Sequence, residues 1–279
     1  MRREHKPLLY KLYHTAAGRM VLKPLTAPAV SRLTGAFLDT RLSTHLISPF
    51  LARTGIDMSD YEQRAFCSFN DFFTRHLAPG ARVADLSPES LIAPCDGLLT
   101  VLPIRDKTVI PVKGVPYSLA ALLRSLSLAE RFDGGLCLVF RLCVDNYHRY
   151  AFFDSGRILR RYAIPGVLHT VRPVALEARK VFVENSREVT LMCTRGFGLA
   201  AQVEVGALLV GRICNRPDVV SFRRAEEKGW FEYGGSTVVV LLRKGTAAID
   251  DAYPADGEER PVRFGQRIGI ALRGSEKRK

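Results

Sequence analysis

The hydrophobic pattern of the chain changes once, close to Pro79-Gly80. Before that point apolar residues recur at helical spacing, and prolines divide the segment into short helices, at Pro7, Pro24, Pro28 and Pro49. After it, short β-branched runs are separated by Gly, Pro, Asn or Asp, as is typical of strands. The runs are LIAPCDGLLTVLPI, KTVIPVKG, GGLCLVFRLCV, REVTLMCT, AAQVEVGALLVGRIC, STVVVLLR and QRIGIAL. We therefore expect an α+β fold, an N-terminal helical region followed by a mostly antiparallel β sandwich or barrel-like core, with one helical insert at 117–126.

The helical region is strongly basic. Residues 1–56 hold nine Lys or Arg against Glu4 and Asp39, which gives +7 of a net charge of +13. Such a charge favours polyanionic partners. The basic residues are interleaved with apolar ones and form no basic stripe, so the pattern favours an anionic lipid surface over nucleic acid.

One stretch of this region has a membrane-like periodicity. Val30, Leu33 and Phe37 recur at helical spacing, and Arg32 and Arg41 lie off that face. This arrangement is typical of a helix lying in a membrane interface. An ordinary helix that covers the core with its apolar face is the alternative.

Length and composition exclude several classes of protein. The chain has 279 residues, 47% of them hydrophobic, which is ample for a core. Its six cysteines contain no CxxC pair, so we expect reduced thiols in a cytosolic setting and no metal site. Lys11, Arg19 and Lys23 interrupt each early apolar run well short of the roughly 20 residues that span a bilayer. We expect neither a spanning helix nor a signal peptide.

Three polar residues have apolar neighbours in the strand-rich part. Asp96 lies in APCDGLL, where a turn aspartate is the alternative reading. His148 lies in VDNYHRYAF, where a hydrogen-bonded core histidine is the alternative, and His169 lies in GVLHTV. These two are the only histidines after residue 76, so acid–base chemistry near neutral pH depends on them.

The stretch WFEYGGSTVVVLL places a serine directly after two glycines, at the start of an apolar run. The hydroxyl of Ser236 can attack the preceding carbonyl, because Gly235 has no side chain to shield that carbon. Glycine also permits the strained backbone that such an attack needs. The sequence contains no G-x-S-x-G element, so Ser236 is the best candidate nucleophile.

Seven segments, in order along about residues 60–245, resemble the phosphatidylserine decarboxylase family. They are FNDFFTRHL (69–77), PCDG (94–97), VKGVPYSLAALL (112–123), NYHR (146–149), ENSRE (184–188), VEVGALLVGRI (203–213) and EKGWFEYGGSTVVVLL (227–242). The resemblance implies that the precursor cuts itself between Gly235 and Ser236 and converts Ser236, beside Thr237, into a covalent pyruvoyl cofactor. The reaction implied is decarboxylation of phosphatidylserine to phosphatidylethanolamine.

The resemblance also implies an organisation. Residues 1–60 would form a membrane-association region and residues 61–279 the catalytic domain, cut into a β chain (1–235) and an α chain (236–279) that stay together, with further dimerisation left open. The protein would be peripheral, on the cytoplasmic face of the cell membrane, with phosphatidylserine and an anionic membrane surface as partners and no nucleic acid.

Site roles follow the family motifs position by position, with one departure. Asp96 matches the acid that orients a histidine for cleavage, and His148 matches the first histidine of a Tyr-His-Arg-x-His pattern, associated with decarboxylation. The second histidine of that pattern, the cleavage base, falls on Ala151. Either His169 takes its place, which we expect, or His148 serves both steps, or cleavage is lost.

Two other functions share these features. A pyruvoyl decarboxylase for another serine-headgroup lipid or for an amino acid would use the same residues. A lipid-binding protein on the same scaffold would keep the helices and stay uncut.

Overall fold

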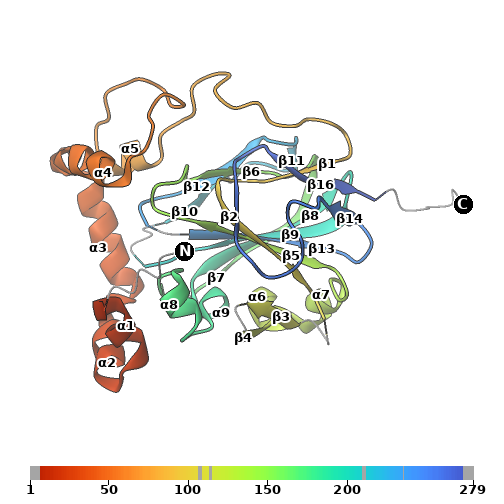
Figure 1. Cartoon of the computed structure of the whole chain (residues 1–279), viewed down its shortest axis with the longest axis horizontal. Coiled ribbons are helices and arrows are strands. Elements are labelled where there is room, and N and C mark those ends of the chain that lie inside the picture. The colour runs from red at the N-terminus through yellow and green to blue at the C-terminus, as the bar shows by residue number, and fades with distance from the viewer. Residues whose placement is uncertain (1–6, 106–108, 113–114, 209–211, 235, 273–279) are drawn as a thin grey trace, which may run out of the picture.

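The computed structural model describes residues 7–105, 109–112, 115–208, 212–234 and 236–272. The N-terminal helices stand at one side of the molecule, and the rest consists of stacked sheets with further short helices beside them (Figure 1). The N-terminal helices are α1 (Pro7–His14), α2 (Ala16–Leu25), α3 (Pro28–Leu38) and α4 (Ile47–Thr54), with a 3-10 turn at Arg41–Leu46 and the short α5 (Phe69–Phe73). The sequence signals for these helices act locally: Pro28 begins α3, and Gly55 ends α4 in the left-handed conformation.

Helix α3 turns its small residues inward. Ser31, Gly35 and Leu38 are buried, whereas Leu33 is 74% exposed and Phe37 50% exposed. Its inner face packs on α5, where the amide of Asn70 donates to the Gly35 carbonyl at 3.4 Å. The predicted apolar stripe is therefore on the outside of the molecule and does not cover the core.

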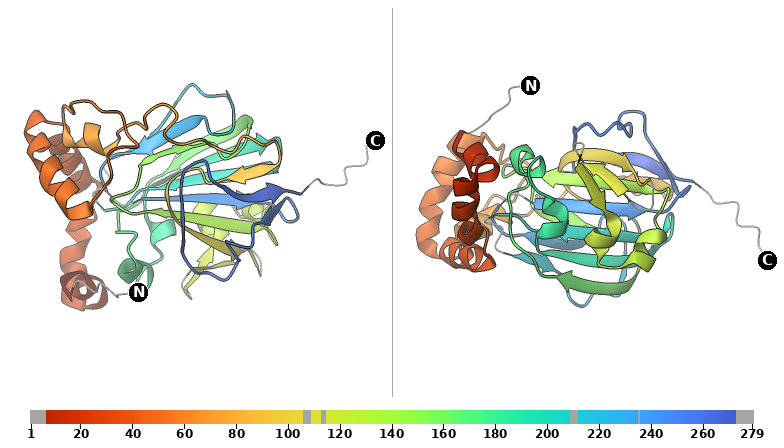
Figure 2. Two further views of the ribbon diagram at one scale, coloured as in Figure 1. Left: turned by 45° about the horizontal axis from the view of Figure 1, so that its top comes forward. Right: turned by 90° about the horizontal axis from the view of Figure 1, so that it is seen from below.

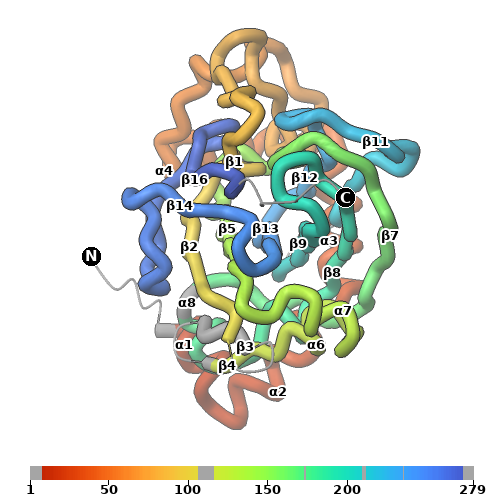
Figure 3. Tube along the Cα trace, turned by 90° about the vertical axis from the view of Figure 1, so that its right-hand side faces the viewer, coloured from red at the N-terminus to blue at the C-terminus, as the bar shows by residue number. Residues whose placement is uncertain are grey.

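An eight-stranded antiparallel sheet forms the centre of the core, in the order β11-β7-β8-β9-β13-β5-β2-β15. Figure 3 looks along it, with β2 and β7 at its two sides. The strands are β2 (Gly97–Pro103), β5 (Leu136–Leu142), β7 (Gly156–Ile164), β8 (Arg187–Thr194), β9 (Gly198–Val205), β11 (Ser221–Phe222), β13 (Ser236–Leu242) and β15 (Arg260–Val262).

Strand β13 is central and every residue in it is buried. It pairs with β5 and β9, and its β-branched and leucine side chains suit a strand covered on both faces. Residues directly opposite in antiparallel strands share a face, and successive residues alternate. Ser236 therefore lies on the face of Glu204, which is opposite Val238, and Thr237 lies on the other face, with Val205.

The two faces have different covers. A small sheet, β6 (Arg149–Ala151), β10 (Ile213–Asn215) and β12 (Glu227–Phe231), covers the Ser236 face, since Lys228 of β12 reaches Glu204 of β9. The short helices α6 (Leu119–Leu123), α7 (Leu126–Glu130), α8 (Pro173–Leu176) and α9 (Val181–Glu184) lie by the other face (Figure 2). Arg187 of β8, in the same row as Thr237, donates to the Leu122 carbonyl of α6 at 2.8 Å. Two further sheets lie at the margins, β1 (Ser90–Ile92) with β14 (Ala247–Ile249) and β16 (Arg267–Ala271), and β3 (Val109–Val112) with β4 (Val115–Ser118).

The predicted α+β class is confirmed, and all strand pairs in the described residues are antiparallel apart from the single bridge between Val167 and Asn185. The single helical insert at 117–126 was wrong in detail. Helix α6 begins at Leu119 because Ser118 caps it, its side chain accepting from the Ala121 amide at 3.3 Å, and α7, α8 and α9 follow as separate short helices.

Candidate active site

Ser236 is the first residue of β13, and its side chain is fully buried. Within the part of the chain that the structure describes, its Oγ has no hydrogen-bond partner, and neither has Oγ1 of Thr237 on the other face. The chain enters the strand through Gly234, whose φ of 137° lies in a region that L side chains rarely adopt. Gly235 lies outside the described residues. A buried hydroxyl without a partner costs free energy, so Ser236 has a reason to be there other than stability.

His148 precedes β6 and belongs to the same buried layer. It is 0% exposed, and its carbonyl accepts from the Phe231 amide of β12 at 2.9 Å. Nδ1 lies 2.9 Å from the Asn146 carbonyl, whereas Nε2 has no hydrogen-bond partner among the described residues. A carbonyl oxygen can only accept, so a neutral ring that donates to Asn146 carries its proton on Nδ1 and leaves a lone pair on Nε2.

The environment of His148 keeps this ring neutral. Burial lowers its pKa to about 3, and the positive charge of Arg75 acts in the same direction. The Gly234 backbone lies close enough to raise the pKa by hydrogen bonding, which places the imidazole beside the residue that precedes Gly235-Ser236. A free acceptor on His148 and a free donor on Ser236 are therefore buried near the same turn, an arrangement that suits proton transfer from a nucleophile.

Asp96 lies close to Tyr147, the residue before His148. Its Oδ1 accepts from Arg82 Nη1 at 2.6 Å and from the Phe264 amide at 2.8 Å. Its charge acts on the pKa of Tyr147, but Asp96 itself makes no hydrogen bond with His148 or His169. We expected this carboxylate to orient the histidine that activates Ser236. Its hydrogen bonds among the described residues go to Arg82 and Phe264 instead, and the group beside Nδ1 of His148 is the Asn146 carbonyl.

His169 lies at the end of the sheet where β13 begins, held there by Asn185. The Asn185 amide donates to the His169 carbonyl at 2.8 Å and to the Gly206 carbonyl at 2.7 Å, and Gly206 follows the residue opposite Thr237. Its ring, however, is occupied. Nδ1 lies 3.4 Å from the Tyr13 hydroxyl and Nε2 lies 3.3 Å from Glu184 Oε2. These contacts tie the loop to helix α1 and give no support to a base role.

A buried arginine and a buried ion pair were missed from the sequence. Arg75, in the segment FNDFFTRHL, is 1% exposed, and none of its three guanidinium nitrogens has a partner. Lys228 and Glu204 form a fully buried ion pair, with Nζ 2.6 Å from Oε2. The place of Arg75 within a phenylalanine-rich segment is a sequence signal for its burial. The pairing of Lys228 with Glu204 could be predicted only if the strand pairing were known.

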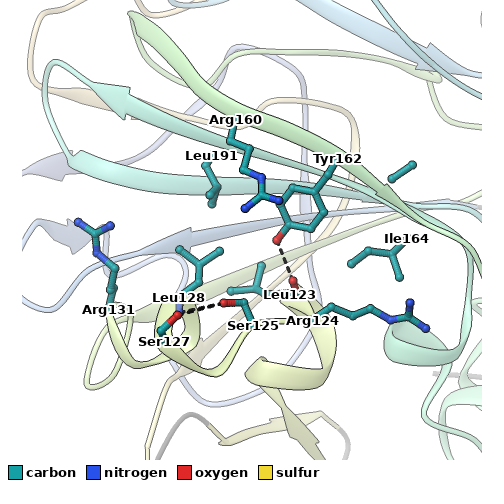
Figure 4. A pocket seen from close by; sticks show the side chains of 11 residues that line it. Leu123, Arg124, Ser125, Ser127, Leu128, Arg131, Arg160, Tyr162, Ile164 and Leu191 are labelled. Atoms are coloured by element: carbon teal, nitrogen blue, oxygen red, sulfur yellow. Dashed lines mark hydrogen bonds between the residues drawn. The ribbon is translucent and has the colours of Figure 1, made fainter.

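A separate hollow of about 510 Å³ opens between α6, α7 and β7 (Figure 4). Arg124, Arg131 and Arg160 lie around it, over apolar residues that include Leu191. Leu191 is opposite Ala201, which lies on the same face of the sheet as Val205 and Thr237. The hollow therefore belongs to the face opposite to that of Ser236. It is not the site built around His148.

The comparisons with known proteins identify the family. The family model for phosphatidylserine decarboxylase matches residues 69–270. Phosphatidylserine decarboxylase proenzyme 2 of Clostridium acetobutylicum is 40% identical over 92% of this chain and 90% of its own length. The phosphatidylserine decarboxylase proenzymes of Ruminiclostridium cellulolyticum (39% identical over 95% of this chain and 91% of its own) and Desulfitobacterium hafniense strain DCB-2 (35% over 97% and 98%) are also similar. The chain therefore belongs to the phosphatidylserine decarboxylase family.

Proposed function

We propose that this protein decarboxylates phosphatidylserine to phosphatidylethanolamine after cutting its own chain between Gly235 and Ser236. Membership of the family carries the reaction class, a carboxy-lyase. The observation that carries the cleavage is the buried Ser236 hydroxyl, which has no partner, with the free Nε2 of His148 in the same layer. Under this proposal residues 1–235 and 236–279 remain together as a heterodimer through the pairing of β13 with β5 and β9.

The cleavage uses groups of this chain. His148 Nε2 accepts the proton of Ser236 Oγ, and Oγ attacks the Gly235 carbonyl carbon. The new ester C–O bond replaces the peptide C–N bond, and the freed nitrogen takes a proton. Loss of the Ser236 Cα proton then breaks the Cβ–Oγ bond, which releases the Gly235 carboxylate. Hydrolysis of the remaining dehydroalanine gives ammonia and the pyruvoyl group.

The residues fit such a group. Position 236 is fully buried at the start of a central strand, where water has little access to a reactive carbonyl. When present, the pyruvoyl group supplies the electron sink for the electrons left as CO2 departs. Neutral His148 is then available to hold or move a proton beside it. Thr237 is paired with Arg141 of β5 and Val205 of β9 in the sheet, and Asp96, through Arg82 and Phe264, fixes the backbone next to β2.

A membrane-bound substrate requires a membrane-facing surface, and we propose that residues 1–60 provide it. Large apolar side chains are exposed on these helices: Leu8, Tyr10, Met20, Val21, Leu25, Leu33, Phe37, Leu42 and Leu46. Basic residues such as Lys11 and Arg19 are exposed among them, as binding to an anionic surface requires. None of the helices in the described ranges is both long and apolar enough to cross a bilayer. These features support a peripheral membrane protein, which we propose lies on the cytoplasmic face of the cell membrane.

The test is the mass of the purified protein under denaturing conditions. Two chains, residues 1–235 and a pyruvoyl-capped 236–279, are expected, together with release of CO2 from phosphatidylserine. Ser236→Ala should remain a single inactive chain, whereas Ser221→Ala, a serine exposed on β11, should be cut normally. A wild-type chain that stays whole and inactive on vesicles would favour the lipid-binding alternative.

A further inference from the structure

Arg75 is a buried cation with no counter-ion. Of the buried arginines in the described part of the chain that have an unpartnered nitrogen, it alone lacks a partner on all three guanidinium nitrogens. Burying a charge without a partner costs several kcal/mol. Its guanidinium carbon lies 4.2 Å from the Tyr61 ring centroid and 5.1 Å from that of Phe72, and such contacts offset only part of the cost.

The neighbouring arginines are paired, which makes Arg75 the exception. Arg82 contacts Asp96 at 2.6 Å, and Arg149 contacts Glu227 at 2.9 Å. Arg149 also donates from Nε to the Thr74 carbonyl at 2.6 Å, so it fixes the backbone immediately before Arg75. The unpaired charge is thus held in place by a paired one, as a preorganised receptor for an anion would be.

Arg75 lies at the catalytic layer. Its charge acts on the imidazole of His148, and the Phe73 ring lies between α5 and that imidazole at a centroid distance of 4.1 Å. Among the described residues, the Arg75 nitrogens, His148 Nε2 and Ser236 Oγ are all buried without a hydrogen-bond partner, and His148 is the residue that links the other two. We propose that Arg75 binds the phosphodiester of the lipid headgroup and so positions the serine moiety at residue 236. This inference rests on the proposed decarboxylase function.

The substrate carries two anions, and the chemistry selects the phosphate. The carboxylate loses its charge as CO2 departs, so an arginine bound to it would stabilise the ground state more than the transition state. The phosphate keeps its charge throughout, so binding it raises no barrier. A planar guanidinium with both edges free also matches two phosphate oxygens.

The experiment compares Arg75→Met and Arg75→Lys with wild type on two amphiphiles of equal chain length. One is phosphatidylserine in mixed micelles, and the other is an O-alkyl-L-serine lipid that has no phosphate. We expect Arg75→Met to lose about 10- to 100-fold in kcat/KM on phosphatidylserine, mostly through KM, and to change less than about twofold on the phosphate-free lipid. Arg75→Lys should recover part of the loss, because it keeps the charge and loses the fork.

The control is Arg160→Met, which removes an arginine whose guanidinium carbon lies 5.0 Å from the Tyr162 ring centroid on the other face of the sheet. This variant should leave kcat/KM unchanged on both substrates. A merely structural role for Arg75 would lower both activities alike, and that outcome overturns the proposal. An active, processed wild type with an unchanged Arg75→Met overturns it while leaving the decarboxylase function intact. If Arg75→Met is not cut, the wild-type enzyme decides: a preference of at least about tenfold for the phosphate-bearing lipid supports the proposal, and equal kcat/KM values overturn it.

Discussion

The rings of His148 and Phe73 lie 4.1 Å apart between their centroids, with their planes inclined by 38°. Phe73 comes from α5, so this contact closes the helical layer over the imidazole. It is one reason why His148 is inaccessible to water and why its pKa is lowered to about 3. The same cover that hides the site from solvent therefore keeps its base in the neutral form.

Neutral burial of His148 predicts acid sensitivity of the fold. The pKa of the folded state lies below the unfolded value of about 6.5, so the unfolded chain binds more protons between these values. The stabilising contribution is complete above pH 6.5 and falls by up to about 1.4 kcal/mol per pH unit below it. Urea unfolding of uncut Ser236→Ala at pH 6 and pH 5 measures this loss. Adding His148→Gln should flatten the pH dependence, and an unchanged slope would contradict the prediction.

The two histidines should differ in processing. His148→Ala removes the free acceptor beside Gly234 and should leave an uncut chain on a denaturing gel. His169→Ala removes contacts to Tyr13 and Glu184 and should be cut, with a loss of about 1 to 2 kcal/mol in the free energy of unfolding. The opposite pattern, a cut His148→Ala and an uncut His169→Ala, would return the base role to His169 as the sequence led us to expect.

The central strands could be predicted because their composition agrees with their burial. Strand β13 and its neighbours β5 and β9 are mostly apolar, and all but four of their residues are buried. Strand β7 was missed because Arg157, Arg160 and Arg161 interrupt its pattern and one side of it is exposed. Strand β7 is formed by its pairing with β8 over eight residues, and not by a strand-like pattern in its own side chains.

The site could be predicted only where a motif marks it. Ser236 and His148 were found by motif, but that they share a layer depends on β12, whose Phe231 holds the His148 backbone. His169 was expected to replace the histidine that is missing at position 151, and its contact with Tyr13, 156 positions away along the chain, could not be read from the sequence. Arg75 was passed over for the converse reason, since an absent partner can be seen only in three dimensions.

The outward stripe of α3 predicts a specific membrane contact. Replacing Leu33 and Phe37 with serine removes exposed apolar surface without touching the buried face of Ser31, Gly35 and Leu38. Binding to phosphatidylglycerol-containing vesicles, measured by sedimentation, should fall by about tenfold or more. Activity on a short-chain, soluble phosphatidylserine should not change.

The matched control replaces Val83 and Leu86, which are as exposed but lie outside the helical region. That pair of serines should leave vesicle binding intact. Equal losses in both double variants would mean that general surface hydrophobicity, and not the α3 stripe, governs binding.

The buried pair of Lys228 and Glu204 predicts an asymmetric response to mutation. Burial raises the pKa of Glu204 and lowers that of Lys228, and each charge opposes the shift of the other. Lys228 Nζ also donates to Asn215 Oδ1 at 2.8 Å, and the Glu204 side chain lies on the same face of the sheet as Ser236. Lys228→Met leaves the carboxylate alone in the core and should lower the free energy of unfolding by about 3 to 5 kcal/mol.

Lys228→Met with Glu204→Gln removes both charges and should recover much of that loss, because no unpaired ion is then left. Urea unfolding of the uncut Ser236→Ala background measures both variants. If the double variant is cut as efficiently as wild type when Ser236 is restored, the ion pair has no role in cleavage, and each ion serves only to neutralise the charge of the other. If it is stable and yet uncut, the ion pair orients β13 for the attack of Ser236, since the loss of stability has been removed as the cause.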